Sequence, residues 1–321
     1  MIGWLLDRFG LGPKLDITLG IPEGQQLRTA LAGGEFQTAE TMISKTGSWE
    51  QRDYLVEMAR EWKGRPGWLD AWVGARPKSP IAFLVRGAHG VRWAWEARGT
   101  GLSAGVSNKA AEQFFARLKG AQRDLEMAAH LDARDPTPWA YRIPIEMNMS
   151  GEIEEVRTYF EEATQRDPTH RRAHWDMLNA LQKRWLGSNA EMFSFAREAA
   201  SNAPPGSSLP ALIVEAHVHR CVEYAVTPEG VDPDEYLRRA AVQNEVLTAA
   251  QRTVLRPNAK PGYFNIQDMN LIAFAFWAGG SAGQARPIFE MLDGRATEHP
   301  WGFRGSNAAA VFRKAERQCG R

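Results

Sequence analysis

The sequence predicts an all-α fold, and three observations support this prediction. Apolar residues recur every three or four positions through most segments, which is the period of an amphipathic helix. Strict alternation of apolar and polar residues, which is typical of half-buried strands, is nearly absent. Glycines and prolines separate the helical segments into pairs. We therefore expect stacked antiparallel helical hairpins.

The apolar period and the positions of glycine and proline place the helices along the chain. Residues 64–80 hold three glycines and three prolines and form the main interruption. We take residues 1–79 as an N-terminal helical cap that is continuous with a helical array over residues 80–321. The expected helices lie near residues 24–32, 35–45, 48–63, 80–98, 108–132, 138–149, 152–166, 170–186, 189–202, 208–225, 232–255, 264–279, 282–293 and 306–318.

Residues 138–168 contain the clearest hairpin. One helix ends near Met149, Ser150 and Gly151 make the turn, and the second helix ends before Pro168, which cannot continue it. The boundary at Asp135-Pro136 lies 32 positions before Pro168, and the pair Pro204-Pro205 begins 36 positions after it. This spacing indicates a repeat of helical hairpins.

These residues carry a resemblance to tetratricopeptide-repeat (TPR) hairpins. Gly151, Phe160, Ala163 and Pro168 match, at matching spacing, the turn glycine, the packing positions and the terminal proline of that family. Three further stretches look similar to an actinobacterial family of TPR-like proteins without an assigned function: HLDARDPTPW, KRWLGSNAEMFSFAREAA and NAPPGSSLPALIVEAH. The resemblance implies a divergent TPR-like α-solenoid and implies no activity.

The composition disfavours several classes of partner and compartment. With 39 basic and 38 acidic side chains the net charge is +1, so no overall field attracts nucleic acid or anionic lipid. Cys221 and Cys319 form no CxxC pair, which favours a reducing cytoplasm. The first residues, MIGWLLDRFGLGP, lack the features of an export signal. The longest apolar run, residues 271–280, is about half of the ~20 residues that a membrane span needs.

Common catalytic and cofactor signatures are missing. The sequence holds no Walker loop, GxSxG elbow, HExxH or clustered CxxC, and we expect no cofactor. The run GTGLSAG at residues 99–105 follows no strand, so we interpret it as a loop between two helices.

The candidate binding surface consists of polar and aromatic stripes on the first helices of the hairpins, which usually line the concave side of such arrays. Helical wheels group Trp93 and Trp175 with polar neighbours and place Leu84, Ala88 and Val91 toward the core. Aromatic rings beside arginines are enriched where proteins bind peptides. The alternative is that neighbouring helices bury both rings. The candidate groove residues are Arg86, His89, Trp93, Glu96, Arg142, Arg172, Trp175, Asn179, Gln182, Glu215 and His219.

The apolar helix near residues 208–225 carries one polar stripe of Glu215, His219 and Glu223, spaced by four. Such a row suits a cation or acid–base chemistry, and it equally suits anchoring of arginines from adjacent hairpins.

Two histidine spacings suggest metal ligands. His217 lies four positions before Cys221, and His170 lies four positions before His174. Neither pair has a third ligand in the local sequence, so we predict no metal site.

Three functional hypotheses follow. The first is a non-catalytic adaptor that holds a peptide or protein partner in the concave groove. The second is a small-molecule-binding protein or an unusual tailoring enzyme, with a closed pocket lined by Glu96, Glu146, Glu215, His219 and Glu223 and with perturbed titration in at least one of them. The third is a structural subunit of an assembly, which exposed apolar area would reveal.

Overall fold

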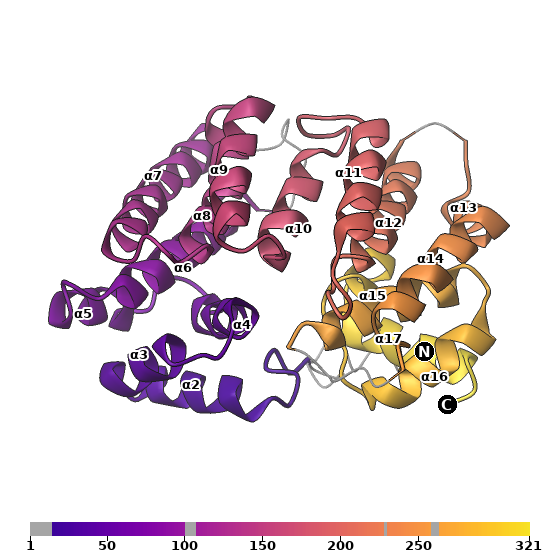
Figure 1. Cartoon of the computed structure of the whole chain (residues 1–321), viewed down its shortest axis with the longest axis horizontal. Coiled ribbons are helices and arrows are strands. Elements are labelled where there is room, and N and C mark those ends of the chain that lie inside the picture. The colour runs from indigo at the N-terminus through magenta and orange to yellow at the C-terminus, as the bar shows by residue number, and fades with distance from the viewer. Residues whose placement is uncertain (1–14, 100–106, 228–229, 258–262) are drawn as a thin grey trace. The chain divides into compact units, whose positions relative to one another are not determined.

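A computed structural model describes residues 15–99, 107–227, 230–257 and 263–321, and these residues form helices and no strand (Figure 1). The prediction of an all-α chain is therefore confirmed. The glycine-rich run at residues 99–105 and the N-terminal segment lie almost entirely outside the described residues. None of the described helices combines the length and apolar character that a membrane span requires.

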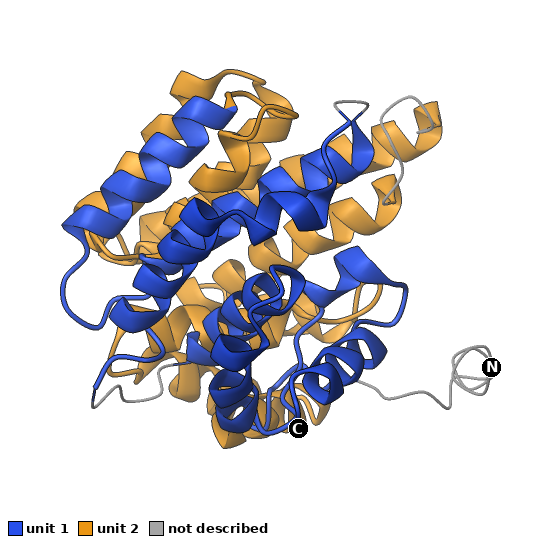
Figure 2. Cartoon of the chain, turned by 90° about the vertical axis from the view of Figure 1, so that its right-hand side faces the viewer, with its two compact units in different colours: residues 1–20, 189–321 blue, residues 21–188 orange. Residues whose placement is uncertain are grey.

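The chain divides into two compact units, coloured separately in Figure 2. Unit 1 comprises residues 1–20 and 189–321, and unit 2 comprises residues 21–188. The boundary that we expected at residue 79 lies inside unit 2, where α4 and α5 both contact α6.

Nine helices form the described part of unit 2. They are α2 (Pro22–Ala32), α3 (Phe36–Ser44), α4 (Trp49–Arg60), α5 (Trp68–Ala75), α6 (Pro80–Arg98), α7 (Asn108–Leu131), α8 (Thr137–Met149), α9 (Ile153–Arg166) and α10 (Arg171–Ala180). The even-numbered helices contact one another in series, because α2 packs on α4, α4 on α6, α6 on α8 and α8 on α10.

Local sequence signals explain where several of these helices begin. Ser48, Ser79 and Ser107 each accept a hydrogen bond from the backbone N–H three residues later, which satisfies a donor that the first turn leaves free. Pro80 follows Ser79 at the first position of α6, where its missing N–H costs nothing.

The two helices of the α6–α7 hairpin pack closely against each other. A Cβ atom added to Gly87 would lie 2.8 Å from the Leu125 side chain, and one added to Gly90 would lie 2.9 Å from the Cβ atom of Ala121. The two glycines therefore allow the helices to approach closely.

Two expectations in unit 2 were wrong in detail. Residues 64–80 are not a plain loop, because they contain α5, whose Trp72 is fully buried and stacks on Phe36. The helix expected to reach residue 186 ends at Ala180. The chain then folds back so tightly that a Cβ atom on Gly187 would lie 2.5 Å from the Leu181 carbonyl oxygen.

Among the described helices of unit 1, α12 (Ala211–Val226) contacts four others. The helix expected over residues 232–255 is interrupted at Arg239, whose backbone is extended. The remaining elements are α11 (Asn189–Asn202), α13 (Pro233–Arg238), α14 (Ala240–Arg252), α15 (Asn265–Ala278), α16 (Ala282–Leu292), the short 3-10 helix η2 (Trp301–Arg304) and α17 (Ala308–Gln318).

Candidate functional site

A pocket of about 510 Å³ lies in unit 2 between α6, α7 and the segment that leads into α5. Its volume falls within the usual range for ligand sites, roughly 300 to 1,000 Å³. Three of the predicted groove residues, Arg86, His89 and Trp93, line it from α6. The sequence-based reasoning missed the rest of the charged lining, which is Arg65, Arg117, Arg123 and Asp124.

Trp93 is the aromatic platform of this pocket, and its side chain is half-buried. The guanidinium of Arg117 lies 3.8 Å from the centre of the Trp93 ring, and that of Arg65 lies 5.2 Å from it. Arg117 also donates a hydrogen bond of 2.6 Å from Nη1 to the Trp93 carbonyl oxygen. Stacking and this hydrogen bond together fix the orientation of the Arg117 guanidinium.

Arg86 is held by carboxylates of the protein itself. Its Nε and Nη2 atoms donate to the two oxygens of Asp124 at 2.8 and 2.7 Å, and Nη1 donates to Asp70 at 3.1 Å. Asp70 also accepts a hydrogen bond of 2.7 Å from Arg65. These contacts join α6, α7 and α5 around the pocket.

His89 is fully buried, although the helical wheel placed it on the outward face of α6. Its two ring nitrogens lie 2.8 Å from the Arg60 carbonyl oxygen and 2.7 Å from the Gly64 carbonyl oxygen. Burial lowers the pKa of His89, and the two carbonyl oxygens partly oppose this effect. His89 thus connects α6 to the end of α4 and to the loop that carries Arg65.

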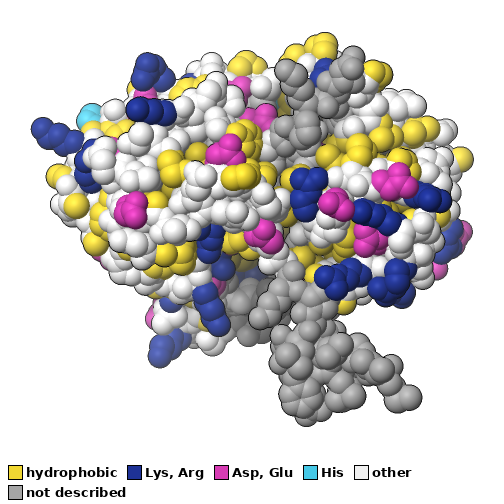
Figure 3. Space-filling view, turned by 90° about the horizontal axis from the view of Figure 1, so that it is seen from below, with side chains coloured by type: hydrophobic (Ala, Val, Ile, Leu, Met, Phe, Trp, Pro, Cys, Tyr) yellow, Lys and Arg dark blue, Asp and Glu magenta, His cyan; other side chains and the backbone are white. Residues whose placement is uncertain are grey.

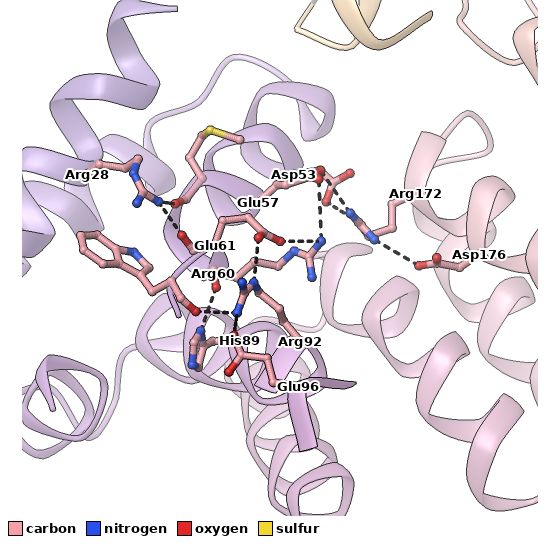
Figure 4. A network of polar contacts seen from close by, with 12 residues as sticks. Arg28, Asp53, Glu57, Arg60, Glu61, His89, Arg92, Glu96, Arg172 and Asp176 are labelled. Carbon is pink, nitrogen blue, oxygen red and sulfur yellow. Dashed lines mark hydrogen bonds and ion pairs between the residues drawn. The ribbon is translucent and has the colours of Figure 1, made fainter. Parts of the chain in front are cut away.

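Glu96 reinforces the same loop and does not face a closed acidic pocket. It accepts a hydrogen bond of 3.0 Å from the Gly64 backbone N–H and pairs with Arg92, which also donates to Glu61 at 2.7 Å. Figure 4 shows these residues beside His89. Glu96 therefore acts as a support for the pocket wall.

Arg172 lies at the other end of the network in Figure 4, among three carboxylates. It is 3.1 Å from Glu57, 3.4 Å from Asp53 and 3.4 Å from Asp176. Burial raises the pKa of Asp53 to about 6, while Arg172 opposes the rise. The side of α10 that we expected to face a ligand is thus occupied here by carboxylates of α4.

The other predicted residues of α10 and the turn after it do not line this pocket. Arg171 lies 4.9 Å from the ring centre of Trp175, and Gln182 donates a hydrogen bond of 2.9 Å to Asn179. Gln182 is buried. Trp175, Asn179 and Gln182 do not line the pocket, so the structure does not support a binding role for them there.

Arg142, a candidate groove residue, and Glu146, a candidate pocket residue, form a buried pair on α8, and neither lines the pocket beside Trp93. Arg142 Nη2 donates to Glu146 at 2.9 Å and to the Tyr159 hydroxyl at 2.7 Å. Arg142 also lines a second hollow of about 250 Å³ with Trp139 and Glu126.

In unit 1, Glu215 is completely buried between two imidazoles. His219 Nε2 lies 2.9 Å from one carboxylate oxygen and His299 Nε2 lies 2.8 Å from the other. Burial alone would raise the pKa of Glu215, but the two histidines lower it below its ordinary value. Glu223 instead forms an ion pair of 2.6 Å with Arg220. The predicted stripe of Glu215, His219 and Glu223 is therefore not a single cluster.

The other histidines of the sequence motifs have separate partners. His217 contacts the Tyr236 hydroxyl and Glu245, both at 2.7 Å, whereas Cys221 faces the Pro233 carbonyl oxygen at 3.6 Å. His170 caps the start of α10. Among the described residues, no three histidine, cysteine or acidic side chains are arranged to hold a metal ion.

Comparison of the sequence with family models and with curated proteins finds no match. The geometry of the site therefore carries the functional argument. On that basis the pocket beside Trp93 is the strongest candidate, because it combines a ligand-sized volume, an aromatic ring and several arginines.

Proposed function

We propose that the protein is a non-catalytic binding protein that holds a segment of a peptide or protein partner at the pocket beside Trp93. The observation that carries this proposal is the position of Trp93 between α6 and α7 with two arginine guanidiniums over its ring. Tryptophan and arginine dominate binding energy where they lie in well-formed pockets.

The scaffold suits this function because hydrogen bonds within unit 2 hold the pocket wall without a ligand. His89, Arg86 and Glu96 fix the pocket wall through backbone carbonyls, carboxylates and a backbone N–H of unit 2 itself. A flexible segment that meets such a surface loses entropy on one side only.

A divergent TPR-like solenoid is the architecture that we propose for unit 2. Serial contacts between every second helix, from α2 to α10, are what stacked hairpins produce. The pocket opens between α6 and α7 and includes Leu69 of α5, so it is not a groove lined by first helices alone.

Filling the pocket tests the proposal. Gly120 lines the pocket in the middle of α7, and a Cβ atom added there would meet no atom within 4 Å. Gly120→Leu should therefore fold normally and obstruct the pocket. Gly74→Leu is the matched control, because Gly74 is an exposed helical glycine of the same unit with equally open surroundings and no place in the pocket.

The measurement is selection of a random peptide library on the wild-type protein, followed by fluorescence anisotropy of the enriched peptides with all three proteins. Enriched peptides should bind the wild type and Gly74→Leu equally and bind Gly120→Leu at least tenfold more weakly. Absence of enriched peptides, or equal binding to Gly120→Leu, would overturn the proposal.

A free anionic small molecule is the second candidate ligand, and the pocket volume of about 510 Å³ favours it. The five residues of the enzyme hypothesis do not support catalysis at this pocket, because none of them lines it. Thermal stabilisation by small acids but by no peptide would favour this candidate.

A further inference from the structure

The charges around the pocket are unbalanced among the described residues. Arg65, Arg86, Arg117 and Arg123 contribute positive charge, and the carboxylates that face them are Asp70 and Asp124. Both carboxylates are bound to Arg86, and Asp70 also to Arg65. The unbalanced charge therefore belongs to the two arginines of α7.

Arg117 is the better placed of these two arginines. It forms no ion pair with a described carboxylate, although its side chain is half-buried and Trp93 covers one face of it. Burial lowers the pKa of Arg117, and the charge of Glu96, which is itself paired with Arg92, opposes this only in part. Only one of its five N–H donors is used by the Trp93 carbonyl oxygen, so a fixed donor edge remains for a ligand.

Arg123 supplies a second positive charge further along the same helix. It is exposed, lines the pocket, and forms no ion pair with a described carboxylate. Six positions separate it from Arg117, which corresponds to about 9 Å along the helix axis at 1.5 Å per residue. A peptide in the extended polyproline II conformation, which has three residues per turn and a rise of about 3.1 Å per residue, covers this distance in about three residues and brings both side chains to the same face.

We propose that the group recognised in this pocket is a pair of carboxylates about three residues apart in an extended acidic peptide, with one carboxylate bound by Arg117 beside Trp93 and the other by Arg123. This inference rests on the proposed function and names its ligand chemistry. Arg86 is a positioning residue, because Asp124 and Asp70 already neutralise it.

A carboxylate of a peptide suits the site better than a nucleic acid backbone. The net charge of the chain is +1, and on the face shown in Figure 3 basic and acidic side chains are interspersed without a continuous basic stripe. A single guanidinium edge matches the two oxygens of one carboxylate.

The test uses four versions of one dodecapeptide of alanine, serine and tyrosine that carries Glu at two positions three apart, Gln at both, or one of each. Binding to the full-length protein is measured by fluorescence anisotropy at low ionic strength. The peptide with two glutamates should bind at least tenfold more tightly than the peptide with two glutamines, because charge-assisted bonds are lost in the latter.

Substitutions of single arginines test which side chain is responsible for the preference for glutamate over glutamine. Arg117→Gln should weaken binding of the two-glutamate peptide about tenfold more than it weakens binding of the two-glutamine peptide. Arg117→Lys keeps the charge without the planar donor edge and should give an intermediate loss. Arg134→Gln is the matched control in unit 2, because Arg134 is almost fully exposed and does not line the pocket. Circular dichroism checks that each variant is folded.

The outcomes separate this inference from the proposed function. If peptides with glutamate and glutamine bind equally and both are lost in Gly120→Leu, the carboxylate inference is wrong and the proposed function stands. Displacement of the peptide by inorganic phosphate more readily than by glutarate would also contradict a carboxylate site. If the wild type binds none of these peptides and the library selection also fails, both proposals are wrong.

Discussion

Arg172 donates a hydrogen bond of 3.1 Å to Glu57, which lies 115 positions earlier in the chain. Through this contact α10 is tied to α4 across the interior of unit 2. Tyr141 of α8 joins the same cluster, with its ring centre 4.7 Å from the Arg172 guanidinium. Removal of one partner from a buried ionic cluster of this kind destabilises the fold, because it leaves an uncompensated charge in the interior.

The first prediction concerns Asp53, which belongs to this cluster and is buried. Burial raises its pKa from 3.8 to about 6, so the folded protein holds its proton more tightly than the unfolded chain does. The stability that Asp53 contributes is therefore complete below pH 3.8 and is lost as the pH rises through 6. Relative to Asp53→Asn, the wild type should lose about 3 kcal/mol of unfolding free energy between pH 3.5 and 7.

Guanidinium titrations of both proteins across this pH range measure the difference. Glu154→Gln is the control, because Glu154 is an exposed carboxylate of the same unit and its replacement should leave the pH profile unchanged. A constant difference between wild type and Asp53→Asn would show that the Asp53 pKa is not raised.

The second prediction compares two glycines of the α6–α7 hairpin. Gly87→Ala places a methyl group 2.8 Å from Leu125 and should cost about 1 to 3 kcal/mol of unfolding free energy through overpacking. Gly120→Ala meets no atom within 4 Å and should gain about 0.5 to 1 kcal/mol from helix propensity. Thermal denaturation of both variants measures the two effects, and equal shifts of Tm would show that the helices are not closely packed at Gly87.

The third prediction concerns Glu215 in unit 1. Glu215→Gln removes the charge between His219 and His299 and should cost about 3 kcal/mol near pH 6, because it breaks a buried pair on one side. Since the histidines lower the pKa of Glu215, the advantage of the wild type is present above pH 4.5 and is lost as the pH falls below it. Glu290→Gln, at an exposed ion pair of α16, should change little. A difference that grows toward low pH would contradict this assignment.

Much of the fold was predictable from the sequence, because helical periods and turn residues are local signals. The exceptions depend on tertiary contacts. Helix α5 is short and is flanked by proline and glycine, and it is stabilised by the burial of Trp72 against Phe36. The break at Arg239 carries no glycine or proline, so no local signal marked it.

The candidate site was predicted only on the α6 side. In an antiparallel hairpin, two facing residues are separated by equal numbers of positions from the midpoint of the hairpin. Here that midpoint falls near position 105 of the sequence. This register places Asp124 opposite Arg86 and Arg117 opposite Trp93, as the contacts confirm. The sequence contained this signal, since both helices and the loop were expected. Arg65 could not be found in this way, because its approach to Trp93 depends on the loop that His89 and Glu96 hold in place.

The fourth prediction concerns Asn270, a fully buried residue of α15 in unit 1. Its carbonyl oxygen accepts hydrogen bonds from Trp301 Nε1 at 2.7 Å and from the Thr297 backbone N–H at 3.2 Å. Its amide donates to the Arg295 carbonyl oxygen at 2.9 Å. Asn270 therefore fixes the segment that leads to Trp301, which lies among Phe274, Phe289 and Phe312.

Asn270→Ala should lower the unfolding free energy by about 3 kcal/mol, because it leaves several buried polar groups without partners. Hydrogen exchange should accelerate at Thr297 and the residues around it while the helices of unit 2 keep their protection. Asn244→Ala is the matched control, since Asn244 is an exposed asparagine of helix α14 in the same unit. Equal stability of the two variants would mean that the hydrogen bonds of Asn270 add nothing to unit 1. Unchanged exchange at Thr297 would show that the aromatic packing of Trp301 alone holds this segment.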